Sequence, residues 1–240
     1  MAPPKATQNK TLHLLCAGAA QGLVKALQAN FERDRGALLH ARFGAVGAMK
    51  EARLAAEPCD LMVLTEAMVT AMAGEGLLLA DTAAALGRVR TGVAVRTGQP
   101  QPDVSTPEAL KAALLAADAV YFPDPVRATA GIHFAKVLQA LGIHDTLQPR
   151  FRTFPNGATA MRELAQTTAP RMIGCTQVTE INDTEGVDLV AALPARFELV
   201  TVYTAAISTS AVQPALAAQF MAQLCGPASR VLRDHGGFEC

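Results

Sequence analysis

The sequence has no Trp and only two Tyr residues, Tyr121 and Tyr203, among its 240 residues. Sugar-binding sites usually stack the sugar ring on aromatic side chains, so this scarcity argues against a sugar ligand. An excess of positive charge is also missing, because Lys+Arg and Asp+Glu both number 21 and no basic run of five or more occurs. The sequence therefore offers no electrostatic support for a nucleic-acid partner.

Cysteine is scarce as well. The five Cys residues lie far apart, at Cys16, Cys59, Cys175, Cys225 and Cys240, without a Cys-x-x-Cys motif or a His/Cys pair at zinc spacing. This pattern predicts neither a disulfide framework nor a metal site, and it is typical of a reducing compartment. The sequence also lacks a Walker loop, a Gly-x-Gly-x-x-Gly motif and a Ser-His-Asp order. We therefore predict no cofactor and no familiar hydrolase chemistry.

Long hydrophobic runs are absent. The first ten residues are polar, and the first apolar run, 12–15, is far too short for a signal peptide or a membrane span. We predict no membrane insertion. The expected location is cytoplasmic as the chain stands, and periplasmic if a leader has been removed.

Half of the residues are hydrophobic and 18% are charged, which is enough apolar material for a large core. A chain of this length fits two lobes of roughly 100 to 120 residues. Short apolar runs alternate with helical patterns. Strands are predicted at 11–17, 37–43, 61–64, 88–96, 119–122, 151–154, 172–176 and 197–207. Helices are predicted at 21–33, 46–56, 66–73, from 105–108 onward, 130–141, 157–167, and between 214 and 233.

This order predicts an α/β fold of two lobes, each a mainly parallel sheet flanked by helices. Two extended segments, around 86–96 and 197–207, are predicted to cross between the lobes. Lobe 1 then consists of 11–87 plus 205–240, and lobe 2 of 88–204. Residues 1–10 form a polar N-terminal tail.

Small and polar residues follow several predicted strands, at 17–22, 43–47, 124–131, 156–159 and 175–177. Ligands of open parallel sheets bind outside the carboxyl ends of strands, where helix N-termini present unpaired N–H groups to negative charge. We therefore predict a small anionic ligand between the lobes, although each turn alone is also consistent with an ordinary strand-to-helix connection. The candidate ligand-binding residues are Ala19, Ala20, Gln21, Val46, Gly47, Arg127, Thr129, Ala130, Thr159, Thr176 and Gln177.

These turns occur in the order and spacing of the molybdate-binding protein family of ABC importers. Ala19 falls on the family's Ala-Ser-Leu turn, 43–46 on Phe-x-x-Ser, 57–60 on Ala-Pro-Ala-Asp, 124–131 on Asp-Pro-x-x-x-Pro-Ala-Gly, and 237–238 on Gly-Phe. The chain resembles this family from 12 to 238. The resemblance implies the type II periplasmic-binding-protein fold, an anion held in the cleft, and an ABC permease as a partner.

The chain departs from the family at the ligand positions. The family holds its oxyanion with two Ser hydroxyls, a Tyr hydroxyl and backbone N–H groups, and these side chains fall here on Ala19, Val46 and Gln177. A buried ligand oxygen left without a partner costs about 1–3 kcal/mol. We therefore predict a retained fold with a changed ligand, bound in part by backbone N–H groups at 19, 46, 130 and 159.

Three functions remain open from the sequence. The first is a solute-binding protein that delivers a carboxylate or inorganic oxyanion. The second is an isomerase similar to aconitate isomerase, which moves a double bond of a small di- or tricarboxylate by proton transfer. Its candidate catalytic residues are Glu180 and His133, each equally consistent with a packed or solvated side chain. The third is a ligand-sensing domain, although no DNA-binding segment is attached.

Overall fold

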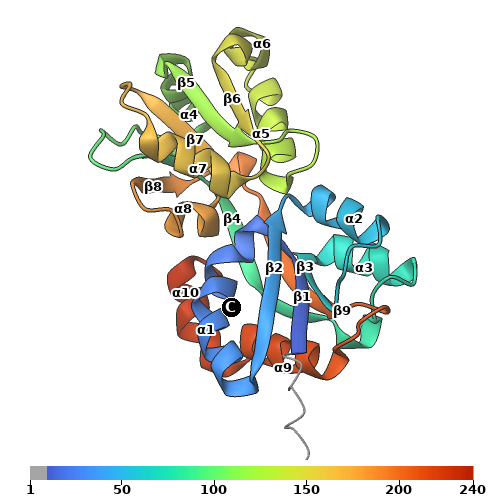
Figure 1. Cartoon of the computed structure of the whole chain (residues 1–240). Helices are drawn as coiled ribbons and strands as arrows, with labels where there is room; N and C mark the ends of the chain where they lie inside the picture. Colours follow the sequence, from blue (N-terminus) through green and yellow to red (C-terminus); the bar gives the residue numbers. More distant parts are fainter. Residues whose placement is uncertain (1–9, 240) are drawn as a thin grey trace, which may run out of the picture.

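The structure is a computed structural model that describes residues 10–239. Of the predicted N-terminal tail only Lys10 falls within this range, and Cys240 lies outside it. The chain folds into two α/β lobes, one above the other in Figure 1. The predicted two-lobed type II fold is confirmed. Within 10–239, no helix has the length and apolar character that crossing a membrane requires.

The first lobe is built on the strand order β2-β1-β3-β9-β4. These strands are β2 (Ala37–Gly44), β1 (Lys10–Ala17), β3 (Leu61–Thr65), β9 (Val200–Ile207) and β4 (Ala84–Arg96). β1 pairs in parallel with β2 and β3, whereas β9 is antiparallel to β3 and β4. Leu14 and Leu15, neighbours on opposite faces of β1, are both buried because helices cover both sides of the sheet.

Five helices cover the first lobe. They are α1 (Gln21–Arg35), α2 (Val46–Leu54), α3 (Glu66–Gly74), α9 (Pro214–Cys225) and α10 (Arg230–Gly236). The chain therefore returns to the first lobe at its C-terminal end (Figure 1). Phe31 of α1 packs edge-on against Phe220 of α9, with ring centroids 4.8 Å apart, and both rings are fully buried.

The second lobe contains the other part of the sheet. β4 pairs antiparallel with β7 (Met172–Gln177) and β8 (Val187–Ala192), while β5 (Ala119–Pro123) lies parallel to β7 and to β6 (Phe151–Phe154). Its helices are α4 (Pro107–Ala116), α5 (Thr129–Ala140), α6 (His144–Leu147), α7 (Gly157–Gln166) and α8 (Val178–Asn182).

Strand β4 belongs to both lobes. Its residues 84–90 pair with β9, and its residues 91–96 pair with β7 and β8. The buried apolar residues change cluster along it, since Val89 packs in the core of the first lobe and Val93 in that of the second. On the segment that returns to the first lobe, Phe197 packs in the core of the second lobe and Tyr203 in that of the first. The lobe boundaries at 87/88 and 204/205 stay a prediction.

The elements differ from the predicted ones mainly at the edges of the second lobe. α6, α8 and β8 were not predicted: the first two are one short turn each, and β8 is a half-exposed strand without strict alternation. The segment predicted as a strand over 197–207 begins as a 3-10 turn at Ala195–Phe197 and becomes a strand only at Val200. Within this turn, the N–H groups of Phe197 and Glu198 donate to the carbonyls of Pro194 and Ala195, so they are not available to a neighbouring strand.

Candidate anion-binding cavity between the lobes

Turns from both lobes meet at one small cavity, which holds about 270 Å³ of empty space and is partly open to solvent. Its lining is mostly Gly and Ala. The residues are Ala17, Gly18, Ala19, Gly44, Ala45, Val46, Pro123, Ala128, Thr129, Ala130, Asn156, Gly157, Gln177, Glu180 and Tyr203. The described lining residues include no Lys or Arg. An anionic ligand in the cavity would therefore be stabilised by neutral hydrogen-bond donors and by helix N-termini.

Helices α2 and α5 begin at this cavity from opposite lobes. Their N-cap residues are Ala45 and Ala128, and neither helix has a side-chain cap. The hydroxyls of Thr65 and Thr106 cap α3 and α4, which begin elsewhere, whereas α1 and α9 also lack a side-chain cap. An uncapped helix start leaves backbone N–H groups without a side-chain partner. At α2 and α5, an anion in the cavity can take the place of the cap.

Helix α7 also begins at the cavity, but the chain itself caps it. Asn156 accepts a hydrogen bond from the Thr159 amide at 2.9 Å, so that amide is not free for a ligand. The Glu180 carboxylate lies over the same helix start and accepts a hydrogen bond from Thr176 Oγ1 at 2.5 Å. Gly157 leaves room for this arrangement, because a Cβ there would overlap both Thr176 Oγ1 and Glu180 Oε2.

Glu180 is the one acidic side chain among the described residues that line the cavity. It is only 6% exposed, and burial raises the pKa of its carboxyl above the usual value. The Thr176 hydroxyl and the backbone N–H groups of Ala158, Gln177 and Gly157 oppose this by lowering the pKa. Across the cleft, the carboxylate faces Gly18, where a Cβ would overlap Oε1. A carboxyl whose charged form is disfavoured by burial holds its proton more readily than a solvated one and is a candidate for proton transfer.

Gln177 and Tyr203 add an amide and a phenol to the cavity, and each is only 2% exposed. Within residues 10–239, neither amide atom of Gln177 makes a hydrogen bond of ordinary geometry, although the amide lies beside the Tyr203 phenol. An amide buried with only this weak contact leaves most of its hydrogen-bonding capacity unused, which costs about 1–3 kcal/mol. The Gln177 side chain is therefore a strong candidate for direct contact with a ligand.

The structure brings several predicted site residues together. Ala19, Val46, Thr129, Ala130 and Gln177 line the cavity, as does the predicted acid or base Glu180. Ala20 is buried behind the cavity lining, Gln21 is the first residue of α1, and Thr176 is fully buried beneath Glu180. Their roles toward a ligand stay predictions.

Other predicted residues lie outside the cavity lining. Gly47 donates its backbone N–H to the Arg127 carbonyl at 3.2 Å, which joins the two lobes beside the cavity. The Arg127 side chain is 54% exposed and lies 3.7 Å from Glu51, in a separate outer hollow that Asp124 also lines. His133 Nε2 lies 2.8 Å from the Phe197 carbonyl.

Sequence reasoning placed Asn156 in a candidate turn without naming it as a site residue, and it missed Tyr203. Asn156 carried a usable signal, because Asn directly before a helix start is a favoured N-cap. Tyr203 carried none, since a Tyr within an apolar strand is usually a packing residue.

The described Cys residues are all free, and no group of three or more His, Cys, Asp or Glu within 10–239 could hold a metal ion. Burial raises the pKa of Cys59 to about 12 and that of Cys225 to about 11. Burial raises the pKa of Cys16 and Cys175 further still. These thiols stay protonated at neutral pH and serve as apolar packing groups.

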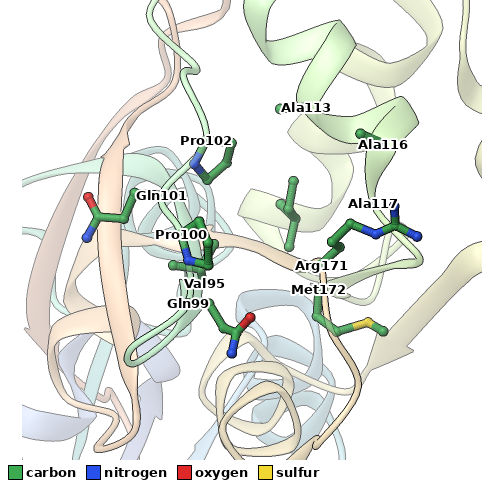
Figure 2. A pocket seen from close by; sticks show the side chains of 11 residues that line it. Val95, Gln99, Pro100, Gln101, Pro102, Ala113, Ala116, Ala117, Arg171 and Met172 are labelled. Carbon is green, nitrogen blue, oxygen red and sulfur yellow. The ribbon is translucent and has the colours of Figure 1, made fainter.

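A second hollow lies on the outer side of the second lobe, between the loop of residues 99–102 and the Ala113 and Ala116 side chains of α4 (Figure 2). Its lining is mainly apolar. The one charged side chain among its described lining residues, Arg171, is paired with Asp118 at 2.7 Å. Binding sites usually contain several converging polar groups, and this hollow does not.

The family model described as bacterial extracellular solute-binding protein matches residues 12–239. A protein named aconitate isomerase, from Pseudomonas sp., is 25% identical over 94% of this chain and 87% of its own length. Two solved structures share the fold. The periplasmic molybdate-binding protein of Azotobacter vinelandii has a TM-score of 0.77 at 18% identity, covering 95% of this chain and 99% of the other. A sulfate-binding protein of Mycobacterium tuberculosis has a TM-score of 0.69 at 16% identity, covering 96% and 86%.

Proposed function

Because the chain belongs to the family of bacterial extracellular solute-binding proteins, we propose that it captures a small carboxylate anion in the cavity between its lobes. The observation that carries this proposal is the pair of uncapped helix starts, α2 from the first lobe and α5 from the second. Each helix start favours negative charge by about 0.3–1 kcal/mol, and by more when buried. The anion would hold the lobes closed by contacting both.

A carboxylate suits this cavity better than a tetrahedral inorganic oxyanion. From the first lobe, Ala19 and Val46 offer the cavity no side-chain hydrogen-bond donor. The remaining side-chain donors, Thr129, Gln177 and Tyr203, come from the second lobe and from β9. A planar carboxylate needs partners for two oxygens rather than four, which these donors and the two helix starts supply.

Thermal unfolding with a ligand panel tests this proposal. The panel contains molybdate, tungstate, sulfate, citrate, cis- and trans-aconitate, and smaller di- and monocarboxylates. A ligand present at 100 times its Kd stabilises the folded state by about 2.7 kcal/mol, so a true ligand raises the melting temperature by several degrees. We expect the largest shift from an organic carboxylate. A dominant shift from micromolar molybdate would overturn the proposal.

A second function, isomerisation, is favoured by Glu180. A charged carboxylate in an anion-binding cavity repels the ligand. The Glu180 carboxyl has a raised pKa, so its protonated form is favoured and it is suited to proton transfer rather than to ligand binding alone. The similarity to aconitate isomerase supports the same function. Glu180 would take a proton from one carbon next to a double bond and return it to the carbon at the other end. The double bond moves by one position, and Glu180 ends as the carboxylate it was.

Proton NMR in deuterated water tests the isomerisation. The best carboxylate ligand should be converted to its double-bond isomer and should gain deuterium at the new carbon position. Ligand recovered unchanged and without deuterium after long incubation with excess protein would exclude isomerisation, and binding would be the one proposed function that remains.

The cellular role separates the two functions further. For a binding protein, we propose an ABC permease partner outside the cytoplasm, as expected for an extracellular family. Deletion of the protein should then abolish uptake of the ligand by its own cell. Unchanged uptake together with loss of isomer conversion in cell extracts would rule out the transport role.

A further inference from the structure

Tyr203 lies on β9, the strand that returns the chain to the first lobe, and its phenol lines the same cavity as Glu180. Its backbone is fixed on both sides, because residue 203 pairs with Thr65 on β3 and with Gly87 on β4. The phenol is therefore presented from the middle of a sheet. Groups on strands hold their geometry better than groups on loops.

The surroundings of the phenol keep it in the O–H form. Burial raises its pKa well above 10, and the negative charge of Glu180 raises it further. The Gln177 amide lowers the pKa only partly in return. At neutral pH, Tyr203 is thus a neutral hydrogen-bond donor beside a group that exchanges protons.

Resting on the isomerase function proposed above, we propose that Tyr203 is a catalytic residue whose O–H donates a hydrogen bond to a carboxylate oxygen of the substrate. When Glu180 removes a proton, the C–H bond breaks and its electron pair moves through the double bond into the conjugated carboxylate. Negative charge grows on that oxygen, where the Tyr203 hydrogen bond stabilises it. The proton then returns from Glu180 to the far carbon, and Tyr203 keeps its own proton throughout.

This role narrows the substrate class. The donor stabilises the reaction only if the carboxylate is conjugated with the carbon that loses the proton. We therefore infer an α,β-unsaturated or β,γ-unsaturated acid as the substrate. Saturated acids of the same size can bind but cannot exchange a carbon-bound proton.

The test compares two conservative variants, Tyr203→Phe and Tyr121→Phe. Tyr121 is the one other Tyr in the sequence. It stacks on Phe154 in the second lobe and does not line the cavity. Loss of one oxyanion donor typically lowers kcat by about 100-fold or more. We expect this fall in Tyr203→Phe with KM changed by less than about threefold, since the hydrogen bond strengthens mainly in the transition state. Tyr121→Phe should behave as wild type.

Tyrosine fluorescence supplies a second readout that needs no turnover. Without Trp, the emission of the protein arises from its two Tyr residues. In Tyr121→Phe, emission comes from Tyr203 alone, so a carboxylate that contacts the phenol should change it during a titration. In Tyr203→Phe, the Tyr121 emission should not respond. A separate thermal melt checks that Tyr203→Phe still folds and melts within a few degrees of wild type.

The outcomes separate this inference from the function on which it rests. A wild-type protein that exchanges no deuterium into any unsaturated acid overturns the isomerase function. An active wild type whose Tyr203→Phe variant keeps its kcat overturns the role of Tyr203 alone. If the Tyr203 emission of Tyr121→Phe does not change when the protein is saturated with a carboxylate, Tyr203 does not contact the ligand.

Discussion

The first lobe lines the cavity with backbone and small apolar side chains, whereas the second lobe adds hydroxyl, amide and carboxyl groups to small apolar residues of its own. Ala17 to Ala19 and Gly44 to Val46 form the first wall. The second wall carries Thr129, Asn156, Gln177 and Glu180, and Tyr203 reaches the cavity from the strand between the walls.

This contrast separates the two tasks of such a site. Both walls attract an anion through a helix start, α2 in the first and α5 in the second, which is a general electrostatic effect that discriminates little among ligands. The second wall has directional groups that can recognise a particular ligand and move a proton. Changes to the second wall should therefore have larger effects than changes to the first.

The largest effect is expected from Glu180→Gln. This change keeps the shape of the side chain but removes proton transfer, which typically contributes 10²–10⁴ in rate. We expect turnover to fall by about 10³, measured by NMR, with ligand affinity kept or raised because a buried negative charge is gone. Glu163→Gln on the exposed face of α7 is the matched control and should be neutral. Near-normal turnover in Glu180→Gln would show that Glu180 does not transfer the proton.

Gly157→Ala should damage the second wall by overpacking. The new methyl group would overlap Thr176 Oγ1 and Glu180 Oε2, so the carboxylate must move from the α7 start. We expect a loss of about 3 kcal/mol in the free energy of unfolding, measured with urea. Gly74→Ala at the end of α3 meets no atom within 4 Å and should change it by less than about 1 kcal/mol. Equal effects of the two changes would show that the wall is loosely packed.

The pH dependence of stability should also report on Glu180. Its folded-state pKa is raised above the usual 4.5, so the folded state binds more protons than the unfolded state above that pH. The contribution of the protonated carboxyl is complete below about 4.5 and is lost as pH rises through the folded pKa. Wild type should thus lose up to about 1.4 kcal/mol per pH unit relative to Glu180→Gln in that window. Asp183 also has a pKa raised by burial but is present in both proteins, so it cancels. Parallel stability curves would contradict the raised pKa.

The smallest effect is expected on the first wall. Val46→Ser restores a hydroxyl at the start of α2, and one added hydrogen bond is worth about 1 kcal/mol. We expect molybdate to bind about fivefold more tightly, by calorimetry or thermal shift. Ala48→Ser, on the same helix but outside the cavity lining, should not change molybdate binding. A similar gain from both changes would mean that position 46 does not face the anion.

The turns of both walls could be predicted from the sequence, but the capping and pairing of individual groups could not. The strand-to-helix turns that hold Ala19, Val46 and Ala130 follow from local alternation of apolar and helical segments, because each turn is contiguous in the chain. Their meeting at one cavity follows from the general geometry of parallel sheets. Thr159 and Arg127 were harder, because whether an amide is already capped, or a guanidinium already paired, depends on neighbours such as Asn156 and Glu51.

Local sequence patterns determine the α/β class, most element positions and the small-residue turns. Hydrophobic periodicity and helix-start residues act over only a few positions of the chain. The pairing of Tyr203 with Glu180 and Gln177 depends on folding, because β9 returns from the second lobe to lie between β3 and β4. Burial then sets the pKa of Glu180, and burial is a property of packing that no short segment carries by itself.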